Sequence, residues 1–583
     1  MYVQNFNPFS NMFQSALLAF LPILYFFFVL IVFKIKGHLA AISTTIVAIL
    51  LSAWIYHMPV ILSIMSAVHG ALYGLFPIGW IVVGAVFLYN ISVKTGQFEI
   101  IKKSIISITD DRRLQVLLIA FSFGAFLEGA AGFGTPVAIT SAMLIGMGFK
   151  AKKAACMSLL ANTAPVAFGG LGIPVLVAAQ VTGFSGAYLA KLLAFICPII
   201  GFIVPFYLIA VMTGLKGIKE VWPAVLVTSL SFSIPMCLTS YFLGPILPDI
   251  TASLCSMIAL VLFLKIWQPK NIYRFDNEKV APQITLSKKA VIKAWSPFII
   301  LIIFIADWGM ASVDSILNMF NISFAIPYLN GAIINGTTNA PIAAIFKLNW
   351  LSAAGTGIVI AAFMSCVILR VSFKQSINIL TQTFSELKLA LLTISGVLAY
   401  AYVANNSGMT TTMGLLVAKT GSWFPLFAPI VGWLGVFVTG SDTSANALFG
   451  KLQTTAFSAV GILPVMGIGA NLAGGAVGKM ISPQSIAIVA GTTGLTGKEG
   501  EIYKFSIKHS IVLLTMICLI IYFYKDVFVS LLAGENGAAV AQAAGSDIIS
   551  STGIVILAAS FIVIFLAKKI LNGPEEIHHY KLQ

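Results

Sequence analysis

Two acidic residues lie in apolar stretches of the sequence, where a charged side chain is costly and is therefore a candidate for function. Glu128 begins the segment Glu128-Gly-Ala-Ala-Gly-Phe-Gly-Thr-Pro136, and Asp442 lies in Gly440-Ser-Asp-Thr-Ser-Ala-Asn446. Apolar surroundings favour the neutral form of a carboxyl group, so either residue could carry a proton. Glu128 and Asp442 are therefore the candidate proton-coupling residues.

Both acids also have simpler interpretations. Asp442 could be a helix N-cap. Glu128 could form an ion pair with Lys451 or Lys479, and Lys479 could instead bind a substrate carboxylate. The sequence leaves these alternatives open.

Helix-start signals lie beside both acids, where Thr135 and any of Ser441, Asp442 and Thr443 could cap the next half-helix, and one recurs in another interrupted stretch. Thr135-Pro136 and Ser482-Pro483 each pair an N-cap residue with proline at the first helical position. Free N–H groups at a helix N-terminus favour an anion, so four such termini meeting at mid-depth would bind a carboxylate. The candidate substrate-binding residues are glycine or polar residues of the four interruptions: Gly132, Gly134, Thr135, Asn162, Thr163, Ser441, Thr443, Ser444, Asn446, Asn471, Lys479, Ser482 and Gln484.

The composition defines the class of protein that positions these residues. The chain has 583 residues, of which 59% are hydrophobic and 9% charged, and its mean hydropathy is +0.99. Such a chain has too few polar side chains to cover a water-soluble surface. Apolar runs of spanning length recur along it, which predicts an all-α polytopic membrane protein. We attribute the net charge of +15 to cytoplasmic loops rather than to nucleic-acid binding.

The apolar runs predict about 13 crossings. Two of them, 151–181 and 463–490, are broken midway by Gly, Pro and Asn; we name these broken helix 1 and broken helix 2. Segments 112–148 and 423–458 are predicted to be re-entrant, and we name them hairpin 1 and hairpin 2. Segments 57–74 and 374–386 have amphipathic spacing and are predicted to lie in the membrane interface. The other crossings are 12–33, 38–56, 75–94, 188–213, 220–243, 247–267, 291–308, 352–371, 387–404, 501–523 and 551–567.

The basic residues predict the orientation. With the N-terminus outside, 28 of the 34 Lys and Arg residues fall in inside loops, which is the bias expected of cytoplasmic loops. This arrangement makes 268–290 a cytoplasmic loop, 531–550 an external loop and the C-terminus cytoplasmic.

The chain also resembles itself. Gly124–Gly129 matches Gly435–Gly440, and Val181–Gly186 matches Thr492–Gly497, both at an offset of 311. An odd number of crossings separates the two copies, so the second is inverted. Inverted repeats with broken helices are typical of secondary transporters with a midplane site. The predicted divisions are 1–56, repeat 1 at 57–213, connecting helices at 214–373, repeat 2 at 374–523, and 524–583.

At these motifs the chain resembles the L-lactate permease family of bacterial proton-coupled monocarboxylate carriers. One departure is that Leu472 and Ala473 stand where hydroxyl side chains are expected after Asn471. The resemblance rests on Phe126–Ile139, Asn162–Phe168, Gly172–Val177, Gln180–Gly183, Thr439–Phe449 and Gly478–Ile486.

This resemblance implies uptake of L-lactate with protons, with D-lactate or glycolate also accepted, by an elevator-like carrier in the bacterial inner membrane. It implies no cofactor or metal, and a homodimer by analogy with other carriers of that class. The expectation from the sequence is therefore a lactate/proton symporter working by alternating access. A Na⁺-coupled carboxylate carrier is the alternative, followed by an anion channel. An intramembrane enzyme is disfavoured, because no metalloprotease or serine-hydrolase motif is present.

Overall fold

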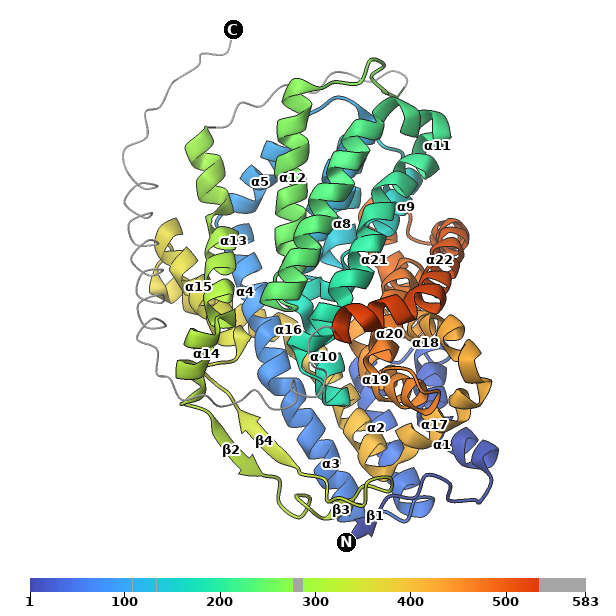
Figure 1. Ribbon diagram of the computed structural model, residues 1–583. Helices are drawn as coiled ribbons and strands as arrows, with labels where there is room; N and C mark the ends of the chain where they lie inside the picture. The colour runs from blue at the N-terminus through green and yellow to red at the C-terminus, as the bar shows by residue number, and fades with distance from the viewer. Residues whose placement is uncertain (107, 133, 276–286, 534–583) are drawn as a thin grey trace.

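The computed structural model describes residues 1–106, 108–132, 134–275 and 287–533, and these residues are mostly helical (Figure 1). Ten helices of this part are long and apolar enough to cross a membrane, or eleven if the bent pair of broken helix 1 counts as one span. The chain is thus a polytopic membrane protein. The total of 13 crossings stays a prediction, and the crossing 551–567 and loop residues 534–550 lie outside the described residues.

Most predicted crossings correspond to helices, with bounds that differ by a few residues. The predicted crossings 188–213 and 220–243 together make up α11, whose backbone is non-helical at Gly214 (φ 71°, ψ −173°) and at Val221, so α11 consists of two helices joined across a kink, as predicted. Segment 374–386, in contrast, runs unbroken into 387–404 as α16. The helices outside the hairpins and broken helices are α1 (Met12–Ile31), α2 (Gly37–Trp54), α3 (Val60–Tyr73), α4 (Trp80–Lys94), α5 (Gln97–Ile106), α11 (Gly186–Leu243), α12 (Pro248–Ile266), α13 (Lys288–Gly309), α14 (Ala311–Asn318), α15 (Ala354–Leu369), α16 (Phe373–Ser407), α17 (Met409–Val417) and α22 (Glu499–Ala533).

Both predicted hairpins are pairs of helices joined by a tight turn. Hairpin 1 contains α6 (Arg112–Gln115), a π-helical stretch Val116–Phe123, α7 (Gly124–Ala130) and α8 (Thr135–Gly146). Hairpin 2 contains α18 (Phe424–Thr439) and α19 (Asp442–Ala459). Their re-entrant placement in a membrane stays a prediction.

Both predicted breaks are present as well. Broken helix 1 consists of α9 (Ala151–Ala161), a short 3₁₀ turn Val166–Phe168 and α10 (Gly169–Thr182), with a bend of 67° between its halves. Gly170, Leu171 and Gly172 all have left-handed backbone, with φ of 53°, 61° and 73°, a conformation that glycine adopts without strain. Broken helix 2 consists of α20 (Val465–Gly478), a 3₁₀ turn Lys479–Ile481 and α21 (Pro483–Thr493).

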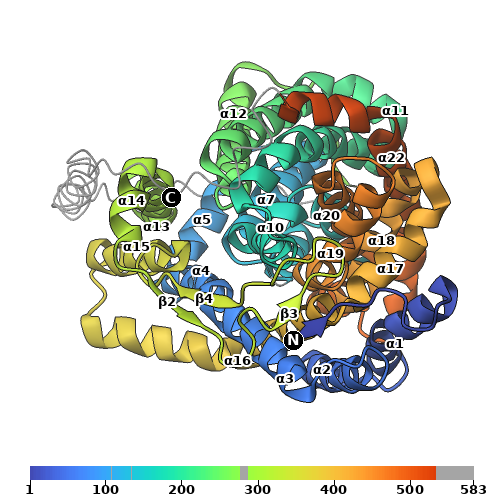
Figure 2. The ribbon, with the colours of Figure 1, turned by 60° about the horizontal axis from the view of Figure 1, so that its bottom comes forward.

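The two halves pack across each other. The second arm of hairpin 1, α8, contacts α21 of broken helix 2, and the second arm of hairpin 2, α19, contacts α10 of broken helix 1. The hydroxyl groups of Ser141 and Thr492 lie 3.2 Å apart at the first of these contacts. Figure 2 shows α7, α10, α19 and α20 in the interior, with α1, α2, α15 and α16 at the edge. Each half therefore completes the surroundings of the other.

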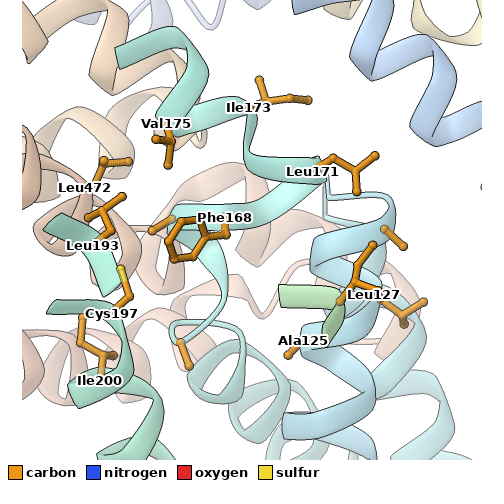
Figure 3. Packing of buried hydrophobic residues seen from close by; sticks show 14 of the residues in the cluster. Ala125, Leu127, Phe168, Leu171, Ile173, Val175, Leu193, Cys197, Ile200 and Leu472 are labelled. Carbon is orange, nitrogen blue, oxygen red and sulfur yellow. The ribbon is translucent and has the colours of Figure 1, made fainter. Parts of the chain in front are cut away.

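Buried apolar side chains fill the space around the break in broken helix 1. Phe168 is fully buried in the turn, with Leu127 of hairpin 1, Leu193 of α11 and Leu472 of α20 in the same cluster (Figure 3). Unwound backbone at membrane depth is tolerated only inside protein or beside a cavity. The apolar cluster provides that protein interior on one side of the break.

The expectation of an all-α chain was incomplete, because two small sheets lie at the end of the molecule that carries the N-terminus (Figure 1). β1 (Tyr2–Val3) pairs in parallel with β3 (Ile333–Ile334), and β2 (Ile322–Ala325) pairs antiparallel with β4 (Ile345–Leu348). These strands are two to four residues long, which is too short for a periodic pattern in the sequence.

The two segments predicted to lie in the interface are helical, but α3 packs on the later part of α16, where Asn406 donates to Ser66, and segment 374–386 contacts α4, where Asn90 donates to Thr383. The backbone of Phe76 (φ −145°, ψ 128°) bends the chain between α3 and α4. Ser372 and Gln375 form a capping box that fixes the start of α16. The placement of segments 57–74 and 374–386 at a membrane interface stays a prediction.

A buried ion network fixes the base of hairpin 1. The guanidinium of Arg113 donates to Asp111 Oδ2 at 2.7 Å and to Glu220 Oε2 at 2.5 Å. It also donates to the carbonyl oxygen of Asn271 at 2.8 Å, and the backbone N–H of Tyr273 donates to Asp111 Oδ2 at 2.9 Å. Hairpin 1 is thereby attached both to α11 and to the segment that follows α12.

Candidate substrate-binding site

Four helix N-termini border one cavity of about 780 Å³. They are the starts of α8 at Gly134, of the regular part of α10 at Ile173, of α19 at Ser441 and of α21 at Pro483. The sequence argument expected these ends to converge, and they meet around one space. Because each terminus presents unpaired N–H groups, this geometry is suited to an anion.

Glu128 and Lys479 form an ion pair at the floor of this cavity. Lys479 Nζ lies 2.5 Å from Glu128 Oε1, and their side chains are 11% and 3% exposed. The amide of Asn162 donates to the other oxygen, Glu128 Oε2, at 3.2 Å. Of the two lysines considered for Glu128, Lys479 is therefore the partner. The pair joins hairpin 1 to broken helix 2.

The backbone of broken helix 1 approaches Glu128 so closely at Gly169 that a larger residue there would displace the carboxylate. A Cβ atom on Gly169 would lie 2.4 Å from Glu128 Oε1, well inside van der Waals contact. The carboxylate of Asp442 is held in the same way in the other half, since a Cβ on Gly475 would lie 2.2 Å from its Oδ1. Each hairpin carboxylate thus packs against a glycine of the broken helix in its own half.

The helix-cap interpretation of Asp442 was wrong. Ser441 is the N-cap of α19 and accepts from the backbone N–H of Ser444 at 3.3 Å, whereas Asp442 is the first helical residue. Asp442 Oδ1 accepts from the amide of Asn446 at 3.2 Å. Its Oδ2 is buried and has no hydrogen-bond partner among the described residues. One oxygen of a buried carboxyl group therefore remains available.

A chain of hydrogen-bonded buried amides supports the Asp442 side chain. Asn471 Nδ2 donates to Asn446 Oδ1 at 2.9 Å, and Gln453 Nε2 donates to Asn471 Oδ1 at 3.3 Å. Both asparagines are fully buried and neither lines the cavity. They were predicted to bind substrate, but in this conformation they position Asp442 instead.

The remaining predicted residues divide into two groups. Those that line the cavity, besides Glu128 and Asp442, are Gly132, Gly134, Ser441, Thr443, Ser444, Lys479 and Gln484, and those outside its lining are Thr135, Asn162, Thr163, Asn446, Asn471 and Ser482.

Two of the residues outside the lining have backbone roles. The hydroxyl of Thr163 donates to the carbonyl oxygen of Leu160 at 2.8 Å. Ser482 is the N-cap of α21, as predicted, and accepts from the backbone N–H of Ser485 at 3.2 Å. Both hydroxyl groups are thereby engaged with the chain itself.

The N-cap predicted at Thr135 was wrong. Gly134 takes that position with φ of 84°, and Thr135 is the first helical residue of α8. A left-handed N-cap favours glycine, so Gly134 rather than the hydroxyl-bearing residue begins the helix.

Asp249 was missed from the sequence. It is fully buried near the start of α12, and neither carboxylate oxygen has a partner among the described residues. A Cβ on Gly129 would lie 2.7 Å from Asp249 Cβ, so the tip of hairpin 1 packs directly on this residue. Asp249 interacts electrostatically with Glu128 and Lys479. The only signal in the sequence is an acid one residue after a proline at the start of an apolar run, which is also how an ordinary helix start looks.

Comparisons with known proteins identify the family of the chain. The family described as L-lactate permease matches residues 15–528. L-lactate permease of Bacillus subtilis is 46% identical over 557 residues, covering 90% of this chain and 99% of that protein. Glycolate permease GlcA of Escherichia coli K12 is 45% identical over 555 residues, covering 91% and 99%.

Among solved structures, the YdaH transporter of Alcanivorax borkumensis is 14% identical with a TM-score of 0.43, covering 79% of this chain and 88% of that one. The match across residues 15–528 and the identity to near-full-length relatives establish the family. The chain belongs to the L-lactate permease family.

Proposed function

We propose that this protein is a secondary active transporter that takes up L-lactate, and also D-lactate or glycolate, across the bacterial inner membrane together with protons. The observation that carries the proposal is the convergence of four helix N-termini and Lys479 on one cavity. Relatives named for L-lactate and glycolate support a small 2-hydroxycarboxylate as the substrate.

Lys479 and the helix N-termini are the proposed ligands of the substrate carboxylate. An ammonium group in a largely buried site forms a strong charge-assisted hydrogen bond to a carboxylate. Ser441, Thr443 and Ser444 line the same cavity; the Ser441 hydroxyl caps α19, and those of Thr443 and Ser444 are available to the substrate hydroxyl. Gln484, at the start of α21, packs against Gly440: a Cβ atom on Gly440 would lie 2.3 Å from Gln484 Oε1.

Coupling follows from competition for Lys479. In the empty site Glu128 already neutralises Lys479, so a substrate carboxylate must displace it. Two carboxylates facing one cation in a buried site repel each other, and protonation of one of them removes this repulsion at the lowest free-energy cost. Protonation of Glu128 releases Lys479 to the substrate, so that proton and lactate bind together. The unpartnered oxygen of Asp442 makes it the second candidate for the proton.

The proposed cycle is alternating access of an elevator-like kind, in which hairpins and broken helices of two inverted repeats surround the site. The cavity extends to His38 at the start of α2 and to Lys34 and Lys36, which lie in a loop predicted to be cytoplasmic. With the N-terminus outside, the described conformation would therefore face inward. The repeat boundaries, the 13 crossings and the orientation belong to this proposal.

The experiment that tests the function is transport in proteoliposomes containing purified protein. Labelled L-lactate is followed under an imposed pH gradient, under an imposed Na⁺ gradient, and without a gradient. Accumulation above equilibrium driven by inward protons alone is the expected result. Accumulation that needs Na⁺ would refute proton coupling, and flux that no gradient drives uphill would indicate a channel. Absence of saturable lactate flux would refute the substrate.

A further inference from the structure

The exposed end of the cavity, which we name the mouth, carries positive charges that take no part in the proposed substrate site. Lys34, Lys36 and His38 line the cavity where α1 passes into α2. Lys34 and Lys36 are exposed. The described part of the chain places no carboxylate within ion-pair distance of either lysine. Both charges therefore act on whatever enters or leaves the cavity.

The floor of the cavity attracts an anion at short range, through its helix N-termini, rather than from a distance. Lys479 is neutralised by Glu128 at 2.5 Å, and Asp442, the other acid in the lining, adds no positive charge. Long-range attraction needs a net charge, because the field of a tight ion pair falls off rapidly. The positive charge that reaches beyond the floor comes from the mouth.

The local fold also keeps this mouth positive. Lys36 is the N-cap of α2 but makes no capping hydrogen bond, and the first turn of α2 contains no acid. A basic residue at a helix N-terminus is unfavourable for the helix, because it adds to the positive end of the dipole. Lys34 has left-handed backbone with φ of 53°, which is uncommon for a residue other than glycine. Local backbone stability therefore favours neither a lysine at the N-cap of α2 nor a lysine at the left-handed position before it.

We infer that Lys34, Lys36 and His38 form an anion-attracting mouth, a low-affinity staging site for the monocarboxylate on the side to which the cavity opens. This inference rests on the proposed function, since it assigns the mouth to the same substrate. Clefts lined by one sign of charge raise the local concentration and the on-rate of an oppositely charged ligand. The mouth should therefore lower KM on one face of the membrane and leave the maximal rate unchanged.

The test is the double substitution Lys34→Gln with Lys36→Gln, in vesicles of zwitterionic phosphatidylcholine. Initial rates of L-lactate flux are measured separately from each face, at about 0.01 M and about 0.15 M salt, between which the Debye length falls from about 30 Å to about 8 Å. We expect KM from the mouth side to rise about tenfold at low salt, with KM from the other face unchanged. The wild-type KM from the mouth side should rise with salt and converge on that of the variant.

Lys374→Gln is the matched control, because Lys374 is an exposed lysine of another predicted inside segment and does not line the cavity. Since KM does not depend on the amount of active protein, poor folding of a variant cannot imitate the expected result. An unchanged KM, an equal change from both faces, or an equal effect of the control would overturn the inference. So would an effect confined to vesicles with anionic lipid, which would assign the lysines to headgroups. Loss of wild-type lactate flux would instead overturn the proposed function.

Discussion

Replacing Glu128 by Gln tests the competition for Lys479. The amide side chain would keep the shape of the carboxyl group but would leave Lys479 without a counter-charge at every pH. The variant therefore imitates permanently protonated Glu128. We expect Glu128→Gln to bind L-lactate equally well at alkaline and at acid pH, whereas binding to the wild type, which takes up a proton with the substrate, weakens as the pH rises. Exchange of lactate should continue, and accumulation driven by a pH gradient should be lost.

The geometry of the pair sets the magnitude. Glu128 Oε1 and Lys479 Nζ lie 2.5 Å apart with 3% and 11% of their side chains exposed, so little water screens them. A hydrogen bond to a charged group contributes about 1.5 to 3 kcal/mol. Lactate must replace this interaction in the ionised wild type but not in the variant. At about 1.4 kcal/mol for each factor of ten, the variant should bind lactate about 10- to 100-fold more tightly at alkaline pH.

The assay combines lactate binding to the purified protein with two flux measurements in proteoliposomes, namely counterflow without a gradient and accumulation under a pH gradient. Glu386→Gln is the matched control, because Glu386 is exposed on α16, accepts a hydrogen bond from Asn90 and does not line the cavity. That control should keep the pH dependence of the wild type. Retention of wild-type accumulation by Glu128→Gln would refute the competition, and so would an alkaline affinity no higher than that of the wild type.

Three further predictions follow from buried contacts. Gly475→Ala would place a Cβ 2.2 Å from Asp442 Oδ1 and should reduce the rate of lactate transport at least about tenfold. The control Gly491→Ala, where the added Cβ meets open space, should transport at the wild-type rate. Equal uptake rates of the two variants would contradict this prediction. Arg113→Leu leaves the buried Asp111 and the partly exposed Glu220 without a cation and should lower the free energy of unfolding by about 3 kcal/mol, chiefly through Asp111, measured as a fall in melting temperature. Loss of the exposed Arg274 pair should cost under about 1 kcal/mol. Neither carboxylate oxygen of the buried Asp249 has a hydrogen-bond partner among the described residues, and a neutral side chain is less costly to bury there than a charged one, so Asp249→Asn should retain proton-driven uptake within about threefold. Loss of accumulation with exchange intact would instead make Asp249 a proton carrier.

The parts of the site that could be predicted are those with a local signal. Glycine clusters, cap-and-proline pairs and acids inside apolar runs mark both hairpins and both breaks, and Glu128 and Asp442 follow from them. These features depend on short-range backbone chemistry, which a sequence displays directly. For the same reason Ser482 was correctly expected to cap its half-helix.

What could not be predicted depends on contacts between distant segments. Nothing near Asp249 in the sequence indicates that the tip of hairpin 1 packs on it. The choice of Lys479 rather than Lys451 for Glu128 is likewise decided by packing between the two halves. Thr135 failed as a cap because Gly134 turns left-handed one residue earlier, a local choice that two adjacent helix-start residues leave ambiguous.

The interlocked packing of the two halves has a consequence for how the protein is made. Ser141 and Thr492 meet across 351 residues, as do Glu128 and Lys479. At a translation rate of about 5 to 20 residues per second, the ribosome needs roughly 20 to 70 seconds to synthesise the missing partner. During that interval the nascent first half contains an unwound helix and an acid whose counter-ion does not yet exist. The newly inserted segments must therefore wait in a protected or protonated form until the second half emerges, and the ion pair at the floor of the cavity is also a late step of assembly.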